Sequence, residues 1–143
     1  MGRRMDRNRA AAPAVAPDAL HRIITEPGSA KLLVQQAQSL GETLAGQGLT
    51  TSQIRAIFGE VRAIQAEMQS DPAKAFRRLT LLKPKMRYRV GKETGRSQQP
   101  IATLVEVLDA AVDEVGEDEG HFTRFVEFFE AVLAYFKAAG GRD

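Results

Sequence analysis

The sequence contains no cysteine and only two histidines among its 143 residues. The lack of cysteine excludes disulfide bonds, thiolate zinc sites, iron–sulfur clusters and cysteine nucleophiles. Two histidines are too few for a metal site built from several imidazoles. We therefore expect a protein that holds no metal ion and no cofactor.

Long apolar runs are missing as well. No stretch approaches the roughly 18 apolar residues that identify a membrane-spanning helix, so we expect no membrane partner. Residues 10–16 consist of alanine, proline and one valine, which is too weakly apolar for the core of a signal peptide. These absences favour a cytoplasmic protein.

No stretch alternates like a β-strand, and apolar residues recur at helical spacing almost everywhere after residue 28. The pattern predicts an all-α fold without a sheet, in which residues 29–143 form a single domain, a five-helix bundle. Residues 1–28 contain arginine, alanine and proline but little that can pack, which predicts a disordered tail. Proline inside the third helix, at position 84, predicts a kink or a short break. The expected start signals are an N-cap at Ser29, a capping box of Thr50 with Gln53, Asp71 before Pro72, Pro100, and an N-cap at Asp118.

The last predicted helix is unusually aromatic, because five of the seven phenylalanines fall between residues 122 and 136. Phe128 and Tyr135 lie off its main apolar stripe. We interpret this helix as the central core helix. The alternative is a second apolar face that packs on another subunit.

Charge is distributed unevenly along the chain. Residues 50–96 hold eleven cationic and four acidic side chains, whereas residues 97–143 hold three and ten. Concentrated like charges repel one another in a folded domain, and a polyanionic partner would relieve the repulsion of the basic block. The alternative is that the two blocks neutralise each other within the fold or across a dimer.

The basic block contains a stripe, and no acidic residue occurs between positions 72 and 92. At about 100° per residue, five cations of the third helix share one face beside its apolar stripe. Arg55 and Arg62 share a face of the second helix without a carboxylate four residues away, so the two helices together could present one continuous cationic surface. Cations that contact phosphate carry no sequence information, which favours binding to a nucleic-acid backbone. The stripe consists of Lys74, Arg78, Lys85, Arg89 and Lys92, while Arg77, Lys83 and Arg87 lie on other sides of the helix.

One aromatic residue accompanies the stripe. Tyr88 is the only aromatic side chain near these cations that could stack on a base. Packing in the core is an equally good explanation for it.

Catalytic candidates are lacking. The serines lie at positions that caps, turns and helix surfaces use, and no histidine has metal-ligand spacing to a carboxylate pair. His121 follows the acidic residues 117–119, but acids are favoured in the first turn of a helix by its macrodipole. We therefore predict that the protein is not an enzyme and has no catalytic residue.

Three segments resemble a known family: LTTSQIRAIFGEVRAIQ (49–65), RRLTLLKPKMRYRVGKE (77–93) and FVEFFEAVLAYFKA (125–138). Together they are similar to the small subunit of the type III-A CRISPR effector, the Csm complex, over about residues 49–138. The resemblance implies an all-helical subunit without an active site of its own, several copies of which stack along the guide RNA assembly. It implies guide RNA, target RNA, other Csm subunits and further copies of this chain as partners in antiviral defence. The cations in the matching segments are Arg55, Arg62, Arg77, Arg78, Lys83, Lys85, Arg87 and Arg89, with Lys92 and Arg96 at the margin.

The predicted function is therefore that of a non-catalytic RNA-binding scaffold subunit that contacts the backbone of a guide–target duplex. The alternative is a helical protein-interaction or oligomerisation module. In that case the basic block docks on the acidic block of a neighbouring protein.

Overall fold

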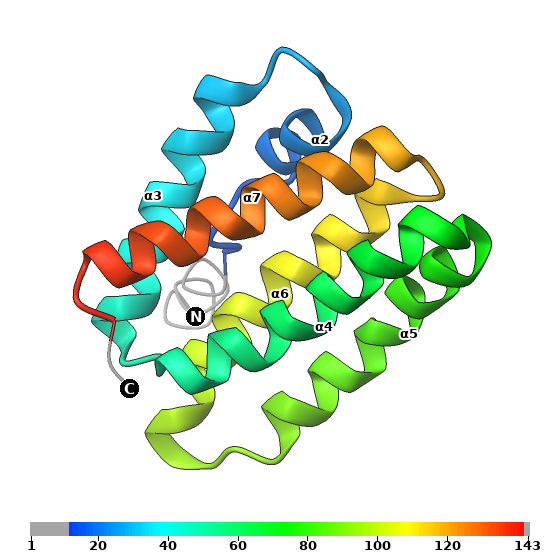
Figure 1. The fold of residues 1–143 in the computed structure, drawn as a ribbon. Coiled ribbons are helices and arrows are strands. Elements are labelled where there is room, and N and C mark those ends of the chain that lie inside the picture. Colours follow the sequence, from blue (N-terminus) through cyan, green and yellow to red (C-terminus); the bar gives the residue numbers. More distant parts are fainter. Residues whose placement is uncertain (1–11, 142–143) are drawn as a thin grey trace, which may run out of the picture.

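A computed structural model describes residues 12–141 of the chain. In this range there are six α-helices, one short 3₁₀-helix and no β-strand (Figure 1). The all-helical prediction is confirmed. The elements are α2 (Pro17–Thr25), α3 (Ala30–Gln47), α4 (Thr51–Ser70), α5 (Pro72–Gly91), η1 (Gly95–Ser97), α6 (Gln98–Val115) and α7 (Glu119–Ala138).

The prediction of five helices is wrong because α2 forms within the segment expected to be a disordered tail. Pro17 occupies the start of this helix, where a missing N–H costs no hydrogen bond. Leu20, Ile23 and Ile24 follow at helical spacing and are almost fully buried against α6 and α7. A helix of nine residues is too short to be stable alone. The packing of these three apolar side chains against the rest of the bundle stabilises it. The predicted disorder of residues 1–11 lies outside the described residues.

The start signals read from the sequence place four of the other five helices correctly. The capping box is present: Gln53 N–H donates to Thr50 Oγ1 over 3.1 Å, and Thr50 N–H donates to Gln53 Oε1 over 2.9 Å. Asp71 and Asp118 cap α5 and α7. Helix α6 instead begins at Gln98, two residues before the proline expected to open it.

Ser29 precedes α3 as expected, but its hydroxyl group does not cap that helix. It donates instead to the carbonyl oxygens of Ile23 (3.1 Å) and Glu26 (2.8 Å), so it ties the start of α3 to the end of α2. Helix α5 runs through Pro84 without the expected break. It packs between α4 and α6, and Pro84 and Thr80 lie on its exposed side, where water can solvate the carbonyl that loses its N–H donor.

Helix α7 is the central core helix, as predicted. It contacts α2, α3, α4 and α6. In Figure 1, α7 and α3 converge toward their C-terminal ends. Phe128 is fully buried and Tyr135 is half-buried, so the apolar side chains off its main stripe are covered by this fold itself.

Helices α3 and α7 approach each other closely at Gly41. A Cβ atom at this position would lie 2.7 Å from the backbone nitrogen of Phe136, 2.8 Å from Cβ of Tyr135 and 2.9 Å from the carbonyl oxygen of Val132. Two of these atoms belong to backbone, which cannot move aside as a flexible side chain can. Glycine at position 41 therefore sets the distance between the two helices.

The first prediction concerns this contact. We expect Gly41→Ala to lower the free energy of unfolding by about 1–3 kcal/mol, because overpacking forces the two helices apart. Gly46→Ala, in the same helix, has open space around the added methyl group and should raise it by about 0.5–1 kcal/mol. Urea denaturation of both variants measures the difference, and equal effects would contradict the close packing.

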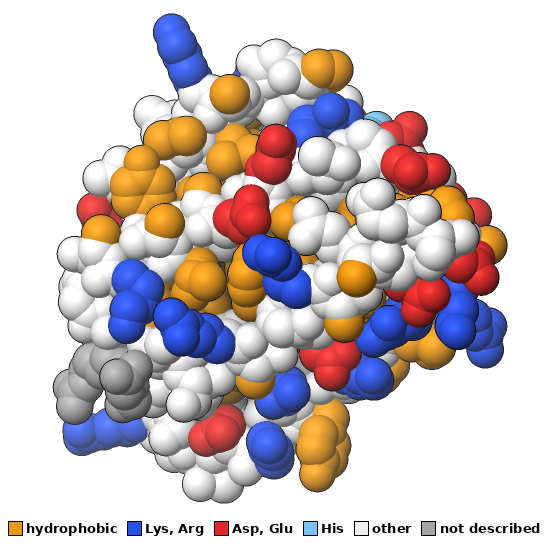
Figure 2. Space-filling view, viewed as in Figure 1, with side chains coloured by type: hydrophobic (Ala, Val, Ile, Leu, Met, Phe, Trp, Pro, Cys, Tyr) orange, Lys and Arg blue, Asp and Glu red, His pale blue; other side chains and the backbone are white. Residues whose placement is uncertain are grey.

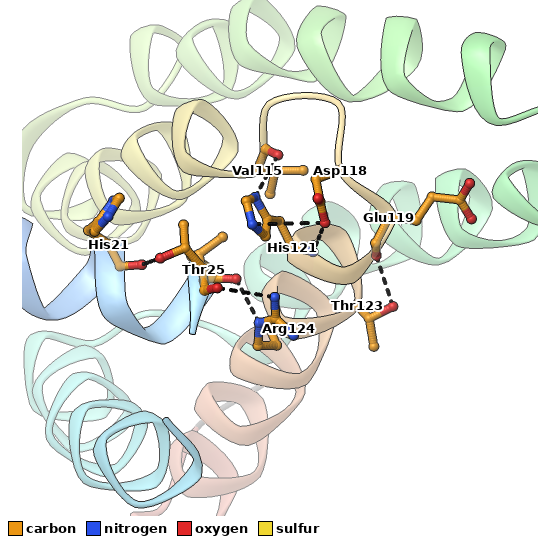
Figure 3. A network of polar contacts seen from close by, with 9 residues as sticks. His21, Thr25, Val115, Asp118, Glu119, His121, Thr123 and Arg124 are labelled. Atoms are coloured by element: carbon orange, nitrogen blue, oxygen red, sulfur yellow. Dashed lines mark hydrogen bonds and ion pairs between the residues drawn. The ribbon is translucent and has the colours of Figure 1, made fainter. Parts of the chain in front are cut away.

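Polar contacts at the α6–α7 turn join this turn to the end of α2 (Figure 3). His121 N–H donates to Asp118 Oδ1 over 2.9 Å, and His121 Nδ1 lies 3.2 Å from the carbonyl oxygen of Val115. The guanidinium group of Arg124 donates to the carbonyl oxygens of Ile24 (2.8 Å) and Thr25 (3.4 Å), which have no partner within α2. The backbone hydrogen bond from His121 lowers the pKa of Asp118 below its ordinary value of 3.8.

The second prediction follows from this pKa. A carboxyl group with a lowered pKa in the folded state contributes stability above its unfolded pKa, and this contribution is lost as the pH falls through the folded pKa. Asp118→Asn keeps a capping oxygen but cannot titrate. In urea denaturation over an acidic pH series, the wild type should therefore lose stability more steeply below pH 3.8 than the variant. Parallel curves would contradict the assigned role of Asp118.

Candidate nucleic-acid interface

Helix α5 carries a row of cations on each side of its apolar stripe. The row toward α4 forms two interhelical ion pairs: Arg78 lies 3.4 Å from Glu67, and Lys85 lies 3.8 Å from Glu60. Both pairs are partly solvent-exposed, and the Lys85 side chain is 63% exposed. Exposed pairs of this kind are worth about 0.2–1 kcal/mol, so these cations remain open to competition from other anions.

The other row of α5 faces α6. Lys83 pairs with Asp109 (3.8 Å) and hydrogen-bonds Asp113, and Arg87 lies 3.4 Å from Asp109. The hydrogen bond to Asp113 and the charge of Asp109 raise the pKa of Lys83, despite its partial desolvation. Lys83 and Arg87, both candidate RNA contacts, are thus engaged in joining α5 to α6.

Helix α4 does not extend the cationic stripe in the way that the sequence predicts. Its glutamates at 60 and 67 face α5, whereas Arg62 lies on the opposite flank, 3.7 Å from Glu130 of α7 and 5.7 Å from the ring centroid of Phe58. The expected continuous cationic surface over α4 and α5 is therefore interrupted by acidic side chains. Figure 2 shows the result: basic side chains spread over the lower part of this face, with acidic side chains among them.

The candidate residues thus divide into paired and unpaired cations. Paired within the described chain are Arg62, Arg78, Lys83, Lys85 and Arg87. Between residues 12 and 141, no ion pair engages the other five candidates, and all five are exposed or half-buried: Arg55, Lys74, Arg77, Arg89 and Lys92.

A groove of about 420 Å³ lies where the paired and unpaired cations meet, near the C-terminal end of α5. Its lining brings together three cations, one carboxylate, a proline and a tyrosine. Tyr88 is 72% exposed, so the interpretation of this residue as a core residue is wrong. The lining residues are Glu60, Pro84, Lys85, Tyr88, Arg89 and Lys92.

Other kinds of site find no support among residues 12–141. No group of three histidine, aspartate or glutamate side chains there could hold a metal ion. His121 is explained by the contacts at the α6–α7 turn. No helix within the described range is both long and apolar enough to cross a membrane.

The acidic partners of the α5 cations on α4 were not predicted from the sequence. Glu60 and Glu67 are seven residues apart and lie on one flank of α4, across its apolar stripe from Arg55 and Arg62. That spacing was visible in the sequence. Which flank faces α5 depends on how the two helices pack, and the spacing alone does not reveal it.

A comparison with known protein families tests the resemblance to the small subunit of the Csm complex. A family model described as Csm2 Type III-A matches residues 28–142, which include α3 to α7. The chain belongs to the Csm2 family. Csm2 is a structural small subunit of the type III-A CRISPR complex and not its catalytic subunit, so this chain is a component of a Csm complex with other subunits. Neither the curated proteins nor the solved structures gave a match.

The third prediction separates the two kinds of cation in this Csm2 protein. Lys83→Met should lower the free energy of unfolding by about 1 kcal/mol at neutral pH, because it removes the ion pairs that Lys83 forms with Asp109 and Asp113 of α6. A raised lysine pKa contributes stability below the unfolded pKa that is lost as the pH rises through the folded pKa. The difference from the wild type should therefore shrink at a pH above 10.5.

Lys74→Met is the matched control for this change. Lys74 lies in the first turn of the same helix, without an ion pair in the described chain, and there the macrodipole disfavours a cation. Chemical denaturation should show no loss of stability for this variant. An equal loss in both variants would contradict the assignment of Lys83 to interhelical contacts.

Proposed function

We propose that this Csm2 protein is a non-catalytic scaffold subunit that binds the RNA backbone of the guide–target duplex through the cations of α5. The observation that carries the proposal is the row Lys74, Arg89 and Lys92, which lies on one flank of α5 without carboxylate partners between residues 12 and 141. Arg78 and Lys85 belong to the same row and form ion pairs that are partly solvent-exposed.

The distribution of acids supports this function. The fold neutralises the flank of α5 that faces α6 by means of Asp109 and Asp113. The opposite flank receives two carboxylates for five cations. A phosphodiester backbone supplies a row of anions to such a surface, and each phosphate that a cation contacts releases counterions.

Recognition would depend on shape and charge. Lysine and arginine side chains bind phosphate irrespective of the attached base, and double-stranded RNA is recognised mainly through its backbone and 2′-hydroxyl groups. A scaffold subunit in an RNA-guided complex must accept any guide sequence, since base pairing between guide and target supplies the specificity.

The helix end offers a structural reason for some of these charges. Arg89 lies in the last turn of α5, where a cation interacts favourably with the macrodipole. That explanation does not extend to Lys74, which lies in the first turn of the same helix and has the unfavourable sign there.

The acidic last third of the chain favours a second candidate function, docking between acidic and basic surfaces of neighbouring proteins. Glu106, Glu117, Glu119 and Glu127 are exposed, and no ion pair within residues 12–141 engages them. Self-association that weakens with salt and does not respond to RNA would favour this function. Light scattering with and without RNA, across a salt series, distinguishes the two.

The fourth prediction tests RNA binding. Arg89→Glu and Lys92→Glu should each lower the affinity for RNA about tenfold at low salt, because a hydrogen bond to a charged group is worth about 1.5 kcal/mol or more. These positions are preferable to Arg78 and Lys85, where a new carboxylate would repel Glu67 or Glu60 and disturb packing. Fluorescence anisotropy with labelled RNA measures the affinity.

Lys31→Glu is the control, because it makes the same change of charge at an exposed position on α3, a helix that has no extensive contact with α5. On a single strand, the slope of log affinity against log salt should fall by about 0.7 for each phosphate that the variant no longer binds. Wild-type affinity that does not depend on salt, or an equal loss in all three variants, would contradict a specific backbone contact at α5.

A further inference from the structure

Tyr88 stands apart from the other aromatic residues of this chain. The chain has seven phenylalanines and two tyrosines, and all of them lie within the described residues. The phenylalanines are buried except for half-buried Phe58, and Tyr135 is half-buried. Only Tyr88 is mostly exposed to solvent, at 72%.

The surroundings of Tyr88 restrict what this ring can bind. Pro84 lies one helical turn before it and Lys92 one turn after it, and both line the same groove of about 420 Å³. Lys92 Nζ lies 6.0 Å from the centroid of the tyrosine ring, within the range of a cation–π interaction. Lys85 and Arg89 complete the cationic rim, and the single acid, Glu60, is paired with Lys85.

This combination differs from a protein-docking patch. Protein interfaces have apolar centres depleted of lysine, with a polar rim around them. Here cations line the groove next to the exposed ring. A flat aromatic ring beside phosphate-binding cations is the arrangement that binds nucleobases by stacking while holding the backbone electrostatically.

We infer that Tyr88 and its groove bind one unpaired RNA base. The base would stack on the Tyr88 ring while Arg89 and Lys92 contact the adjoining phosphates. This inference rests on the proposed function and adds a base-binding position to a surface otherwise limited to backbone contacts.

The inference has a consequence for selectivity. In a continuous duplex each base is covered on both faces by its neighbours, so a side chain cannot stack on it without unstacking the helix. An unpaired base has a face available. The surface should therefore prefer RNA with unpaired nucleotides to a blunt, fully paired duplex.

The experiment uses the full chain and two labelled probes: an unstructured single strand of about ten nucleotides, within the site sizes usual for single-strand binding, and the blunt duplex that this strand forms with its complement. Tyr88→Ala should weaken binding of the single strand about 5- to 150-fold, the effect of losing one stacked base. Binding of the duplex should not change. The salt dependence should also be unchanged, because no cation is removed.

Two matched variants isolate the ring. Tyr88→Phe retains the stacking surface and should bind like the wild type. Leu81→Ala removes the other large apolar side chain exposed on α5, 47% exposed, and should leave RNA binding unchanged. Circular dichroism of each variant shows whether helicity is retained.

A third probe tests the base directly. If abasic residues replace the bases of the single strand, the wild type and Tyr88→Ala should bind it equally, because the stacking partner is gone from both. A persistent difference on the abasic strand would overturn base stacking. Equal affinity of the wild type and Tyr88→Ala for the normal single strand would overturn it as well.

The outcomes also distinguish this inference from the proposed function. If Arg89→Glu weakens both probes and Tyr88→Ala weakens neither, backbone binding stands and base stacking is wrong. If no variant changes RNA binding, the proposed function itself fails. Loss of assembly with Csm subunits in Tyr88→Ala without any loss of RNA affinity would assign Tyr88 to a protein contact and overturn the inference.

Discussion

The charge surface of this protein depends on one packing constraint, the position of α5 at the side of the bundle between α4 and α6. Helix α5 buries a single apolar stripe against these two helices and contacts no other helix extensively. The cations on either flank of that stripe therefore lie beside a neighbouring helix. The positions of the acidic residues on that helix determine which of these cations form ion pairs. The flank facing α6 meets Asp109 and Asp113, while the flank facing α4 meets Glu60 and Glu67.

The two flanks of α5 differ in how many cations they leave without an ion pair. Lys83 contacts two carboxylates, one of which is shared with Arg87, so this flank serves the fold. Along the α4 flank, Lys74, Arg89 and Lys92 are left without an ion pair in the described chain. Ion pairs that are partly solvent-exposed contribute little to stability, so Arg78 and Lys85 can exchange a carboxylate for a phosphate at small cost. Three of the cations without an ion pair in the described chain thus lie in one row on α5.

Membership of the Csm2 family places the cationic flank of α5 in the context of an RNA-guided complex. A scaffold subunit in an RNA-guided complex needs contacts that tolerate every guide sequence, and cations aligned along a rigid helix meet that need. The exposed Tyr88 among them would add a different kind of contact, the base stacking that we infer. Stacking is also indifferent to base identity, since every base has a π-face, but it is sensitive to whether the base is paired.

The sequence by itself determined the class of the fold and most helix boundaries, because both depend on local chemistry. The spacing of apolar residues, the capping box at Thr50 and the N-caps at Asp71 and Asp118 all act within a few residues of the chain. Only the tertiary structure decided the existence of α2, the partners of the cations and the exposure of Tyr88. Helix α2 is stabilised by α6 and α7, which lie far away in the sequence, and each ion pair of α5 depends on which flank of a neighbouring helix faces it. A helical wheel shows which residues share a face, whereas the packing of one helix against another determines what that face meets.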